Sequence, residues 1–286
     1  MRATTRLREL LKAGRTLVAP GVFDGLSARL VARAGFPAAY ASGGAIARST
    51  GVPDLGLLSL DEIAARLATI VDAMALPVIA DADTGYGNAL NVQRAVRAFE
   101  RAGVAALHLE DQTFPKKCGH YDDKSLVPAA EMTAKLKAAR DALVDQDFII
   151  IARTDAIAVE GFSAALDRAA AYGDAGADVI FVEAPESEAH IVEVAQRFPG
   201  WKLINMFAGG KTPLLPVNRL EALGYNIVII PSDLQRAAIA AMARALDCIK
   251  RDGSSAAMAA AMTTFKEREA LMDTAAYLAR DKKYGS

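Results

Sequence analysis

Eight short apolar runs, each followed by a helical segment, constrain the fold of this 286-residue chain more than any other feature. We expect strands at residues 16–20, 38–42, 77–81, 106–110, 148–153, 179–183, 202–206 and 227–230. Continuous apolar runs such as Phe148-Ile-Ile-Ile are typical of parallel strands that are buried on both faces. Eight strand–helix units therefore predict an α/β fold, a closed (β/α)8 barrel forming a single domain over residues 1–286.

Helices are expected between these strands, and two more after the last one. Apolar spacing predicts helices at residues 1–10, 23–34, 60–74, 89–102, 129–143, 163–175, 188–197, 218–223 and 234–251, with residues 42–54 as a loop. Two further helical stretches, 255–261 and 264–280, exceed what a barrel needs, so we assign residues 254–286 to a C-terminal extension. Because such apolar tails often pack against a neighbouring subunit, we expect an oligomer. An open doubly wound sheet is the alternative, but no Gly-x-Gly-x-x-Gly follows the first strand.

Composition excludes several classes of partner. The formal charge is −1, from 33 basic and 34 acidic residues, which gives no surplus of positive charge for nucleic acid or a membrane surface. No apolar run reaches the roughly 18 residues that span a bilayer, and the N-terminus lacks a signal-peptide core. Two distant cysteines, Cys118 and Cys248, form no disulfide framework, so a reducing cytoplasm is expected.

Polar or glycine-rich clusters follow almost every predicted strand. In a barrel the carboxyl ends of the strands meet at one face, where active sites form. Asp81 and Asp83 end the third strand and Glu110 ends the fourth, so these carboxylates should converge. Hard oxygen ligands without a histidine–cysteine cluster favour Mg²⁺, with Mn²⁺ possible, over Zn²⁺. The alternative is that the two aspartates cap the following helix and pair with an arginine.

The segment after the fourth strand, residues 107–120, is the most reactive of these loops. Two lysines precede Cys118, and a neighbouring cation favours the thiolate. Gly119 allows the backbone to approach a bound group closely. Ser42-Gly43-Gly44 can bind an anion through backbone N–H groups, although such a tripeptide is more often a turn. Arg153 is either a carboxylate clamp or a partner of Asp155 or Glu183.

Three other side chains have a structural interpretation that is at least as good as a functional one. His108 lies inside the fourth strand, where a core position and a functional position are equally compatible with the sequence. His190 and Cys248 lie on predicted helical faces, and we assign both to packing.

Several motifs, taken together, resemble the isocitrate lyase and phosphoenolpyruvate mutase superfamily over residues 10–250. They are Tyr40-Ala-Ser-Gly-Gly44, Gly51-Val-Pro-Asp54, Asp81-Ala-Asp-Thr-Gly-Tyr-Gly87, Glu110-Asp-Gln112, Lys116-Lys-Cys-Gly-His120, Ala152-Arg-Thr-Asp-Ala156 and Asn205. The Lys-Lys-Cys-Gly-His loop is similar to the carbon–carbon lyase branch, which includes 2-methylisocitrate and 2,3-dimethylmalate lyases.

The resemblance implies a barrel, usually a homotetramer that exchanges its terminal helix between subunits, and a Mg²⁺-held 2-oxo or 2-hydroxy carboxylate. It assigns the metal to Asp54, Asp81, Asp83 and Glu110, with Asp54 acting mainly through water. The substrate would contact Tyr40, Ser42, Gly43, Gly44, Gly119, His120, Arg153 and Asn205. Cys118 would be the general acid in a retro-aldol cleavage, with Lys116, His120, Arg153 and Glu183 around it.

Three departures from the family pattern concern substrate choice. Met206-Phe-Ala208 follows Asn205 where relatives have Asn-x-x-Glu, and Pro231-Ser-Asp233 replaces Pro-Leu-Ser or Pro-Leu-Thr. A C-terminal arginine used by methylisocitrate lyases has no clear counterpart near residues 264–268. Alternatives to the lyase are an oxaloacetate hydrolase or decarboxylase, a phosphonopyruvate-type mutase, and a non-catalytic barrel that binds a metabolite.

Overall fold

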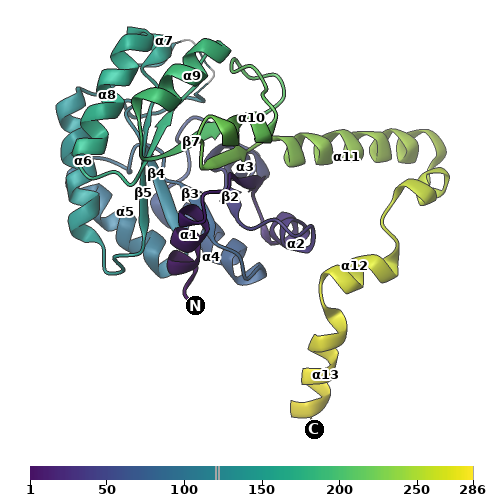
Figure 1. The fold of residues 1–286 in the computed structure, drawn as a ribbon. Coiled ribbons are helices and arrows are strands. Elements are labelled where there is room, and N and C mark those ends of the chain that lie inside the picture. The colour runs from purple at the N-terminus through teal and green to yellow at the C-terminus, as the bar shows by residue number, and fades with distance from the viewer. Residues whose placement is uncertain (120, 122, 286) are drawn as a thin grey trace.

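Eight parallel strands close into a barrel in sequence order in the computed structural model, which describes residues 1–119, 121 and 123–285 (Figure 1). The predicted (β/α)8 barrel is therefore confirmed. Almost every strand residue is buried, as the continuous apolar runs indicated. The strands are β1 Leu17–Val22, β2 Ala39–Ala41, β3 Val78–Asp81, β4 Ala106–Glu110, β5 Ile149–Thr154, β6 Val179–Val182, β7 Trp201–Asn205 and β8 Ile227–Ile230.

Helices connect the strands and surround the barrel (Figure 1). They are α1 Ala3–Lys12, α2 Gly25–Arg33, α3 Gly43–Ser49, α4 Leu60–Ala73, α5 Ala89–Ala102, α6 Ala129–Ala142, α7 Ile157–Glu160, α8 Phe162–Asp174, α9 Glu188–Arg197, α10 Val217–Ala222, α11 Asp233–Asp252, α12 Phe265–Leu271 and α13 Thr274–Tyr284, with a 3₁₀ helix at Ala256–Ala261. The predicted cap of α4 is present, since Ser59 Oγ accepts a hydrogen bond from the Glu62 N–H at 3.3 Å.

Three of the sequence expectations for helices were wrong. The expected loop at residues 42–54 contains α3, whose two initial glycines weaken the helical signal although Ser42 caps it. The short helix α7 was not expected. The single helix expected over 264–280 is two helices, α12 and α13, because the backbone turns into the left-handed region at Asp273, with φ of 56°.

One end of the barrel is closed by the N-terminal helix. Leu7 and Leu11 of α1 are buried in the same apolar cluster as the inward-facing residues of the strands. Arg8 fastens the helix by donating hydrogen bonds to the carbonyl oxygens of Asp147 and Phe148 at 2.8 and 3.2 Å. The barrel interior is therefore a packed core, and the opposite face, at the carboxyl ends of the strands, is left for a site.

The C-terminal helices leave the barrel. Helix α11 extends away from it, and the chain then returns so that α12 contacts α2, where Arg29 donates a hydrogen bond to the carbonyl oxygen of Leu271 at 3.4 Å (Figure 1). Only Gln235 and Cys248 of α11 are buried, while Ile239, Met242, Leu246 and Ile249 form an exposed apolar stripe. None of the described helices combines the length and the apolar character needed to cross a membrane.

Candidate active site

The register of the strands brings the predicted site residues together. Asp81 at the end of β3 pairs with His108 of β4, and Glu110 at the end of β4 pairs with Arg153 of β5. Side chains two residues apart in a strand share a face, so His108 and Glu110 both point into the barrel mouth. Three neighbouring strands thus deliver acidic and basic groups to one place.

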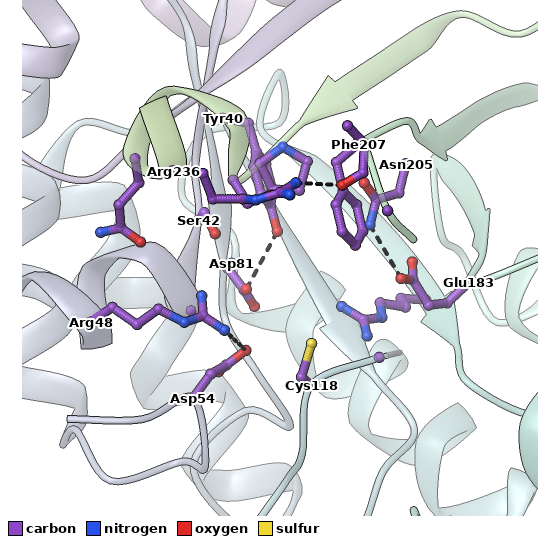
Figure 2. A pocket seen from close by; sticks show the side chains of 18 of the residues that line it. Tyr40, Ser42, Arg48, Asp54, Asp81, Cys118, Glu183, Asn205, Phe207 and Arg236 are labelled. Atoms are coloured by element: carbon purple, nitrogen blue, oxygen red, sulfur yellow. Dashed lines mark hydrogen bonds and ion pairs between the residues drawn. The ribbon is translucent and has the colours of Figure 1, made fainter. Parts of the chain in front are cut away.

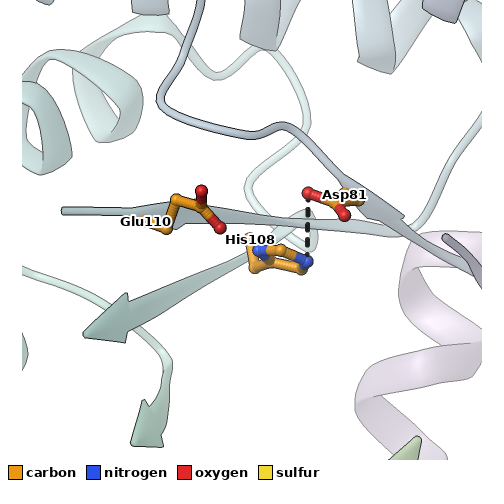
Figure 3. A group of neighbouring side chains, drawn as sticks. All are labelled: Asp81, His108 and Glu110. Carbon is orange, nitrogen blue, oxygen red and sulfur yellow. Dashed lines mark ion pairs between the residues drawn. The ribbon is translucent and has the colours of Figure 1, made fainter. Parts of the chain in front are cut away.

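Asp81, His108 and Glu110 form a buried cluster whose potential ligand atoms all lie within 4.8 Å of one another (Figure 3). His108 Nε2 lies 3.4 Å from Asp81 Oδ1 and 2.7 Å from the hydroxyl of Tyr40. Burial lowers the pKa of His108 to about 4, so the imidazole is neutral at pH 7. Sequence reasoning left the role of His108 open, although its spacing of two from Glu110 already placed both side chains on the same strand face.

Asp54 and Asp83 flank this cluster and share a buried lysine. Lys116 Nζ lies 2.8 Å from Asp83 Oδ1 and also contacts Asp54 Oδ1. Burial opposes the charged ammonium, but the surrounding carboxylates raise the pKa of Lys116 well above its ordinary value. Lys116 therefore belongs to the carboxylate cluster and links the loop after β4 to Asp54, which follows α3.

The carboxylate cluster has the donors that a hard divalent cation requires. Glu110 Oε1 is buried and has no hydrogen-bond partner among the described residues. Burial, with the charges of Asp81 and Asp54, raises the pKa of Asp83 to about 6 although Lys116 opposes the shift. Such excess negative charge in a buried place is what a bound cation would offset. The residues present therefore fit Mg²⁺ or Mn²⁺.

Arg153 is held by carboxylates on two sides. Its Nη1 lies 3.1 Å from Glu110 Oε2, while Nε and Nη2 donate to the two oxygens of Asp155 at 2.9 and 3.0 Å. Asp155 is held in turn by Lys124, whose Nζ lies 2.9 Å from Oδ1. The ion pair with Asp155 anticipated from sequence is thus present, and Arg153 also lines the cavity described below.

Residues 42–44 form the start of helix α3. Ser42 Oγ accepts the Ala45 N–H at 3.2 Å, and the Gly43 N–H donates to Asp81 Oδ2 at 3.1 Å. A Cβ on Gly43 would lie 2.8 Å from the same Asp81 oxygen, so glycine is required for this close approach. The backbone of α3 is therefore bound to the carboxylate cluster, and the Gly43 N–H already donates to Asp81.

Cys118 and Gly119 approach the cluster from the loop after β4. Cys118 is half-buried and lines the cavity (Figure 2). A Cβ on Gly119 would collide with Arg153 and Glu183, so the backbone here packs directly against both side chains. Asn205 Nδ2 donates to Glu183 Oε1 at 3.2 Å, which fixes the end of β7 next to β6. His120, also expected in this site, lies outside the described residues.

One cavity of about 330 Å³ is lined by some of these groups, among them Asp81, Cys118 and Arg153 (Figure 2). Arg48, Gln235, Arg236 and Ile239 are not among the site residues that the sequence predicts, because the sequence predicts a loop in place of α3 and a barrel helix in place of α11. The first turn of a helix that follows a strand lies at the same barrel face as the end of that strand. Residues at the starts of the predicted helices could therefore have been listed as site candidates. The lining residues are Tyr40, Ser42, Gly44, Arg48, Asp54, Asp81, Lys116, Cys118, Gly119, Arg153, Glu183, Asn205, Phe207, Ala208, Gly209, Pro231, Ser232, Gln235, Arg236 and Ile239.

Comparison with known proteins identifies relatives along nearly the whole chain. A family model described as phosphoenolpyruvate phosphomutase matches residues 7–250. The chain is 47% identical to a 2,3-dimethylmalate lyase of Eubacterium barkeri, over 95% of this chain and 94% of that protein. It is 44% identical to a 2-methylisocitrate lyase of Bacillus subtilis, over 95% of this chain and 89% of that protein.

Solved structures agree in fold over the same extent. A crystal structure of 2,3-dimethylmalate lyase, described as a member of the PEP mutase and isocitrate lyase superfamily, matches with a TM-score of 0.94 and 36% identity, covering 100% of this chain and 96% of the other. A phosphonopyruvate hydrolase in complex with oxalate and Mg²⁺ matches with a TM-score of 0.91 and 33% identity, covering 100% of both chains.

Proposed function

Because the chain belongs to the phosphoenolpyruvate mutase and isocitrate lyase superfamily, we propose that it is a Mg²⁺-dependent carbon–carbon lyase. Its substrate would be a 2-hydroxy di- or tricarboxylate, split into a 2-oxo acid and a second carboxylate. One observation carries the proposal: the half-buried thiol of Cys118 lines the same cavity as a buried carboxylate cluster. Relatives that bear the names 2,3-dimethylmalate lyase and 2-methylisocitrate lyase support the same reaction class.

Asp81, Asp83 and Glu110 would hold the ion, with Asp54 contributing through water. A bound Mg²⁺ supplies a Lewis acid that stabilises negative charge on the oxygens of the substrate. The chain itself contributes orientation: Arg153 is fixed by Glu110 and Asp155 and presents a positive charge to the cavity. Tyr40, the backbone of α3 and Asn205 would bind the substrate carboxylates at the inner end.

Proton transfer completes the proposed reaction. The substrate hydroxyl loses its proton, the neighbouring carbon–carbon bond breaks, and the electron pair of that bond passes to the leaving fragment. Cys118 gives the thiol proton to that carbon, so one proton leaves an oxygen and one arrives at a carbon. Lys116 and Glu183 surround this step as charged neighbours, and Gly119 keeps the thiol-bearing backbone close to Arg153.

Replacement of the thiol tests the proposal directly. We expect Cys118→Ser to reduce kcat by about 10²–10⁴-fold, the usual contribution of a general acid. Cys248→Ser is the matched control, because Cys248 is buried in α11 and does not line the cavity. Products from 2,3-dimethylmalate, 2-methylisocitrate, isocitrate, oxaloacetate and phosphonopyruvate would be identified by mass spectrometry. A Cys118→Ser enzyme that cleaves at the wild-type rate would remove the acid role.

We also propose a homotetramer that acts in the cytoplasm and in which the C-terminal helices exchange between subunits. The exposed stripe of Ile239, Met242, Leu246 and Ile249 supports this, because an apolar stripe of that length is normally covered. Light scattering on the purified chain would measure the mass. We expect Leu246→Glu to dissociate the assembly, and a monomeric wild-type protein would contradict the proposal.

A further inference from the structure

The loop that carries Cys118 starts and ends on two short backbone segments that lie against each other. Gln112, which follows the end of β4, forms an antiparallel bridge with Leu126. Next to that bridge, the Thr113 N–H donates to the Ser125 carbonyl oxygen at 2.9 Å. The base of the loop is therefore fixed at the end of the barrel, and side chains at the base can reach residues within the loop.

The side chain of Gln112 binds the backbone of the residue that precedes Cys118. Its Nε2 donates to the Lys117 carbonyl oxygen at 2.9 Å, and its Oε1 accepts the Lys117 N–H at 2.9 Å. Gln112 is 1% exposed and does not line the cavity. A buried amide needs hydrogen-bond partners, and here both of its polar groups bind a single residue next to the proposed acid. Gln112 thus fixes the peptide plane that joins Lys117 to Cys118.

The two carbonyl oxygens that follow along the chain are also held. The Cys118 carbonyl oxygen accepts the Tyr121 N–H at 2.9 Å. The Gly119 carbonyl oxygen accepts a hydrogen bond from Lys124 Nζ, which also donates to Asp155 Oδ1 at 2.9 Å. The side chain of Lys124 is 1% exposed, so both contacts are shielded from water. Lys124 therefore ties Gly119 to the carboxylate that follows β5.

Fixed peptide planes on both sides of a residue leave its side chain little freedom of direction. Because the peptide bond is planar, the two planes that flank Cys118 set its φ and ψ angles and the direction of its Cα–Cβ bond. Rotation about that bond then remains as the freedom of the thiol. A general acid must lie within hydrogen-bond distance of the atom that it protonates, and a displacement of about 1 Å can cost about a hundredfold in rate.

We propose that Gln112 is a positioning residue that orients the thiol of Cys118 by holding the preceding peptide, and that Lys124 supports the same segment from the other side. The inference rests on the proposed lyase function, in which Cys118 is the general acid, and adds to it the residues that orient that acid. Gln112 acts through the backbone and lies outside the cavity lining. Its loss should therefore lower kcat much more than it alters KM.

Gln112→Met tests the two hydrogen bonds, because methionine has a similar volume but makes neither of them. We expect kcat to fall about 10–100-fold while KM changes by less than about three-fold. Gln196→Met, at an exposed position of α9 outside the cavity, is the matched control and should equal wild type. An unchanged kcat in Gln112→Met would show that Gln112 only fills space and would overturn the proposal.

A second substitution shows whether Gln112 acts through the thiol. In the Cys118→Ser background, Gln112→Met should change the residual kcat by less than about two-fold, because no thiol is left to orient. A general structural role would lower kcat by the same factor whether or not the thiol is present. Equal losses in the two backgrounds would therefore overturn the assignment.

Alkylation by iodoacetamide tests the orientation of the thiol without any assay of cleavage. Peptide mass spectrometry would follow Cys118 and Cys248 separately in the same protein. Because Cys118 is half-buried, release of the flanking peptide should expose its thiol and raise its reaction rate at least about five-fold in Gln112→Met. The buried Cys248 should keep its wild-type rate, since only a general loosening of the fold would speed up both cysteines.

This measurement distinguishes failure of the inference from failure of the proposed reaction. Faster alkylation confined to Cys118 supports the role of Gln112 even if the wild-type chain cleaves none of the substrates. A rate within about two-fold of that in Gln196→Met overturns the role even if cleavage is observed. Lys124→Met is the second variant, which decides the question if Gln112→Met does not fold, and it should also speed up alkylation of Cys118.

Discussion

The inner wall of the cavity and its rim differ in how completely their charges are paired. The inner wall, with the residues directly behind it, includes Asp81, Glu110, Lys116, Arg153 and Asp155, all of which are buried. Ion pairs join Lys116 to Asp83, and Arg153 to both Glu110 and Asp155. The rim consists of Ala208, Asp233 and Arg236, at the ends of β7 and β8. Its two charged side chains are 38% and 56% exposed.

This difference indicates that the inner wall and the rim have different roles. Groups fixed by several buried partners are preorganised, which suits cation binding and charge stabilisation. Exposed groups with few partners can change without disturbing the core, which suits the choice of substrate. We therefore expect substitutions in the inner wall to reduce turnover strongly, and substitutions at the rim to alter KM.

The largest effect is expected for Asp81→Asn. The Gly43 N–H donates to Asp81 Oδ2 and the Asp83 N–H donates to Oδ1. The amide would keep the size of the carboxylate, but it could accept only one of these two hydrogen bonds and would lose the charge that the cation needs. Activity should fall by more than about a hundredfold and Mg²⁺ affinity should fall with it. Steady-state assays and Mg²⁺ titration would measure both. Activity within ten-fold of wild type would mean that the inner wall is not the metal site.

Gly43→Ala tests how tightly the inner wall is packed. The added Cβ would lie 2.8 Å from Asp81 Oδ2, so either α3 or the carboxylate must move. We expect turnover to fall about a hundredfold, as it does when a positioned group shifts by about an ångström. Gly200→Ala is the matched control, because nothing lies within 4 Å of a Cβ there and its turnover should not change. Equal behaviour of the two variants would contradict the proposed close packing.

Asp83→Asn should stabilise the metal-free protein although Asp83 is a proposed metal ligand. Burial raises the pKa of Asp83 to about 6 in the folded protein, above the value of the unfolded chain. The folded state therefore binds more protons between these two values, and this contribution to stability is lost as pH rises through about 6. Without Mg²⁺ at pH 7.5, Asp83→Asn should raise the free energy of unfolding by about 1–3 kcal/mol.

Urea unfolding at pH 7.5 and pH 4, with a chelator present, would measure this contribution. The advantage of the variant should shrink at the lower pH and should reverse when Mg²⁺ is added. Asp72→Asn, an exposed carboxylate, should change stability by less than about 0.5 kcal/mol under all conditions. A variant that is less stable than wild type at pH 7.5 without Mg²⁺ would show that the buried charge of Asp83 does not destabilise the folded protein.

Asp233→Asn should have the smallest effect. It removes the carboxylate that lies 3.7 Å from Arg236 Nη1 and so leaves the guanidinium freer for a ligand. Because both side chains are exposed, we expect KM to fall only about two-fold with kcat unchanged. A ten-fold rise of KM in the steady-state assay would instead show that Asp233 itself supports the substrate.

The barrel, and the face of it at which the site forms, could be predicted from the sequence alone. Apolar runs such as Phe148-Ile-Ile-Ile identify strands by local composition, and the topology of parallel strands then places their carboxyl ends together. The family was also evident from sequence, because its motifs consist of consecutive residues such as Lys116-Lys-Cys-Gly-His120. These features depend on local order along the chain.

Which of those residues pair with one another could be seen only in the folded structure. That Lys116 reaches Asp54 and Asp83, that Arg153 joins Glu110 to Asp155, and that His108 joins the carboxylate cluster depend on strand register and side-chain direction. Arg236 lines the cavity because it lies on the first turn of α11, which starts at the end of β8 (Figure 1). Contacts between residues that are distant in sequence follow from packing in three dimensions. No single local pattern of residues encodes them.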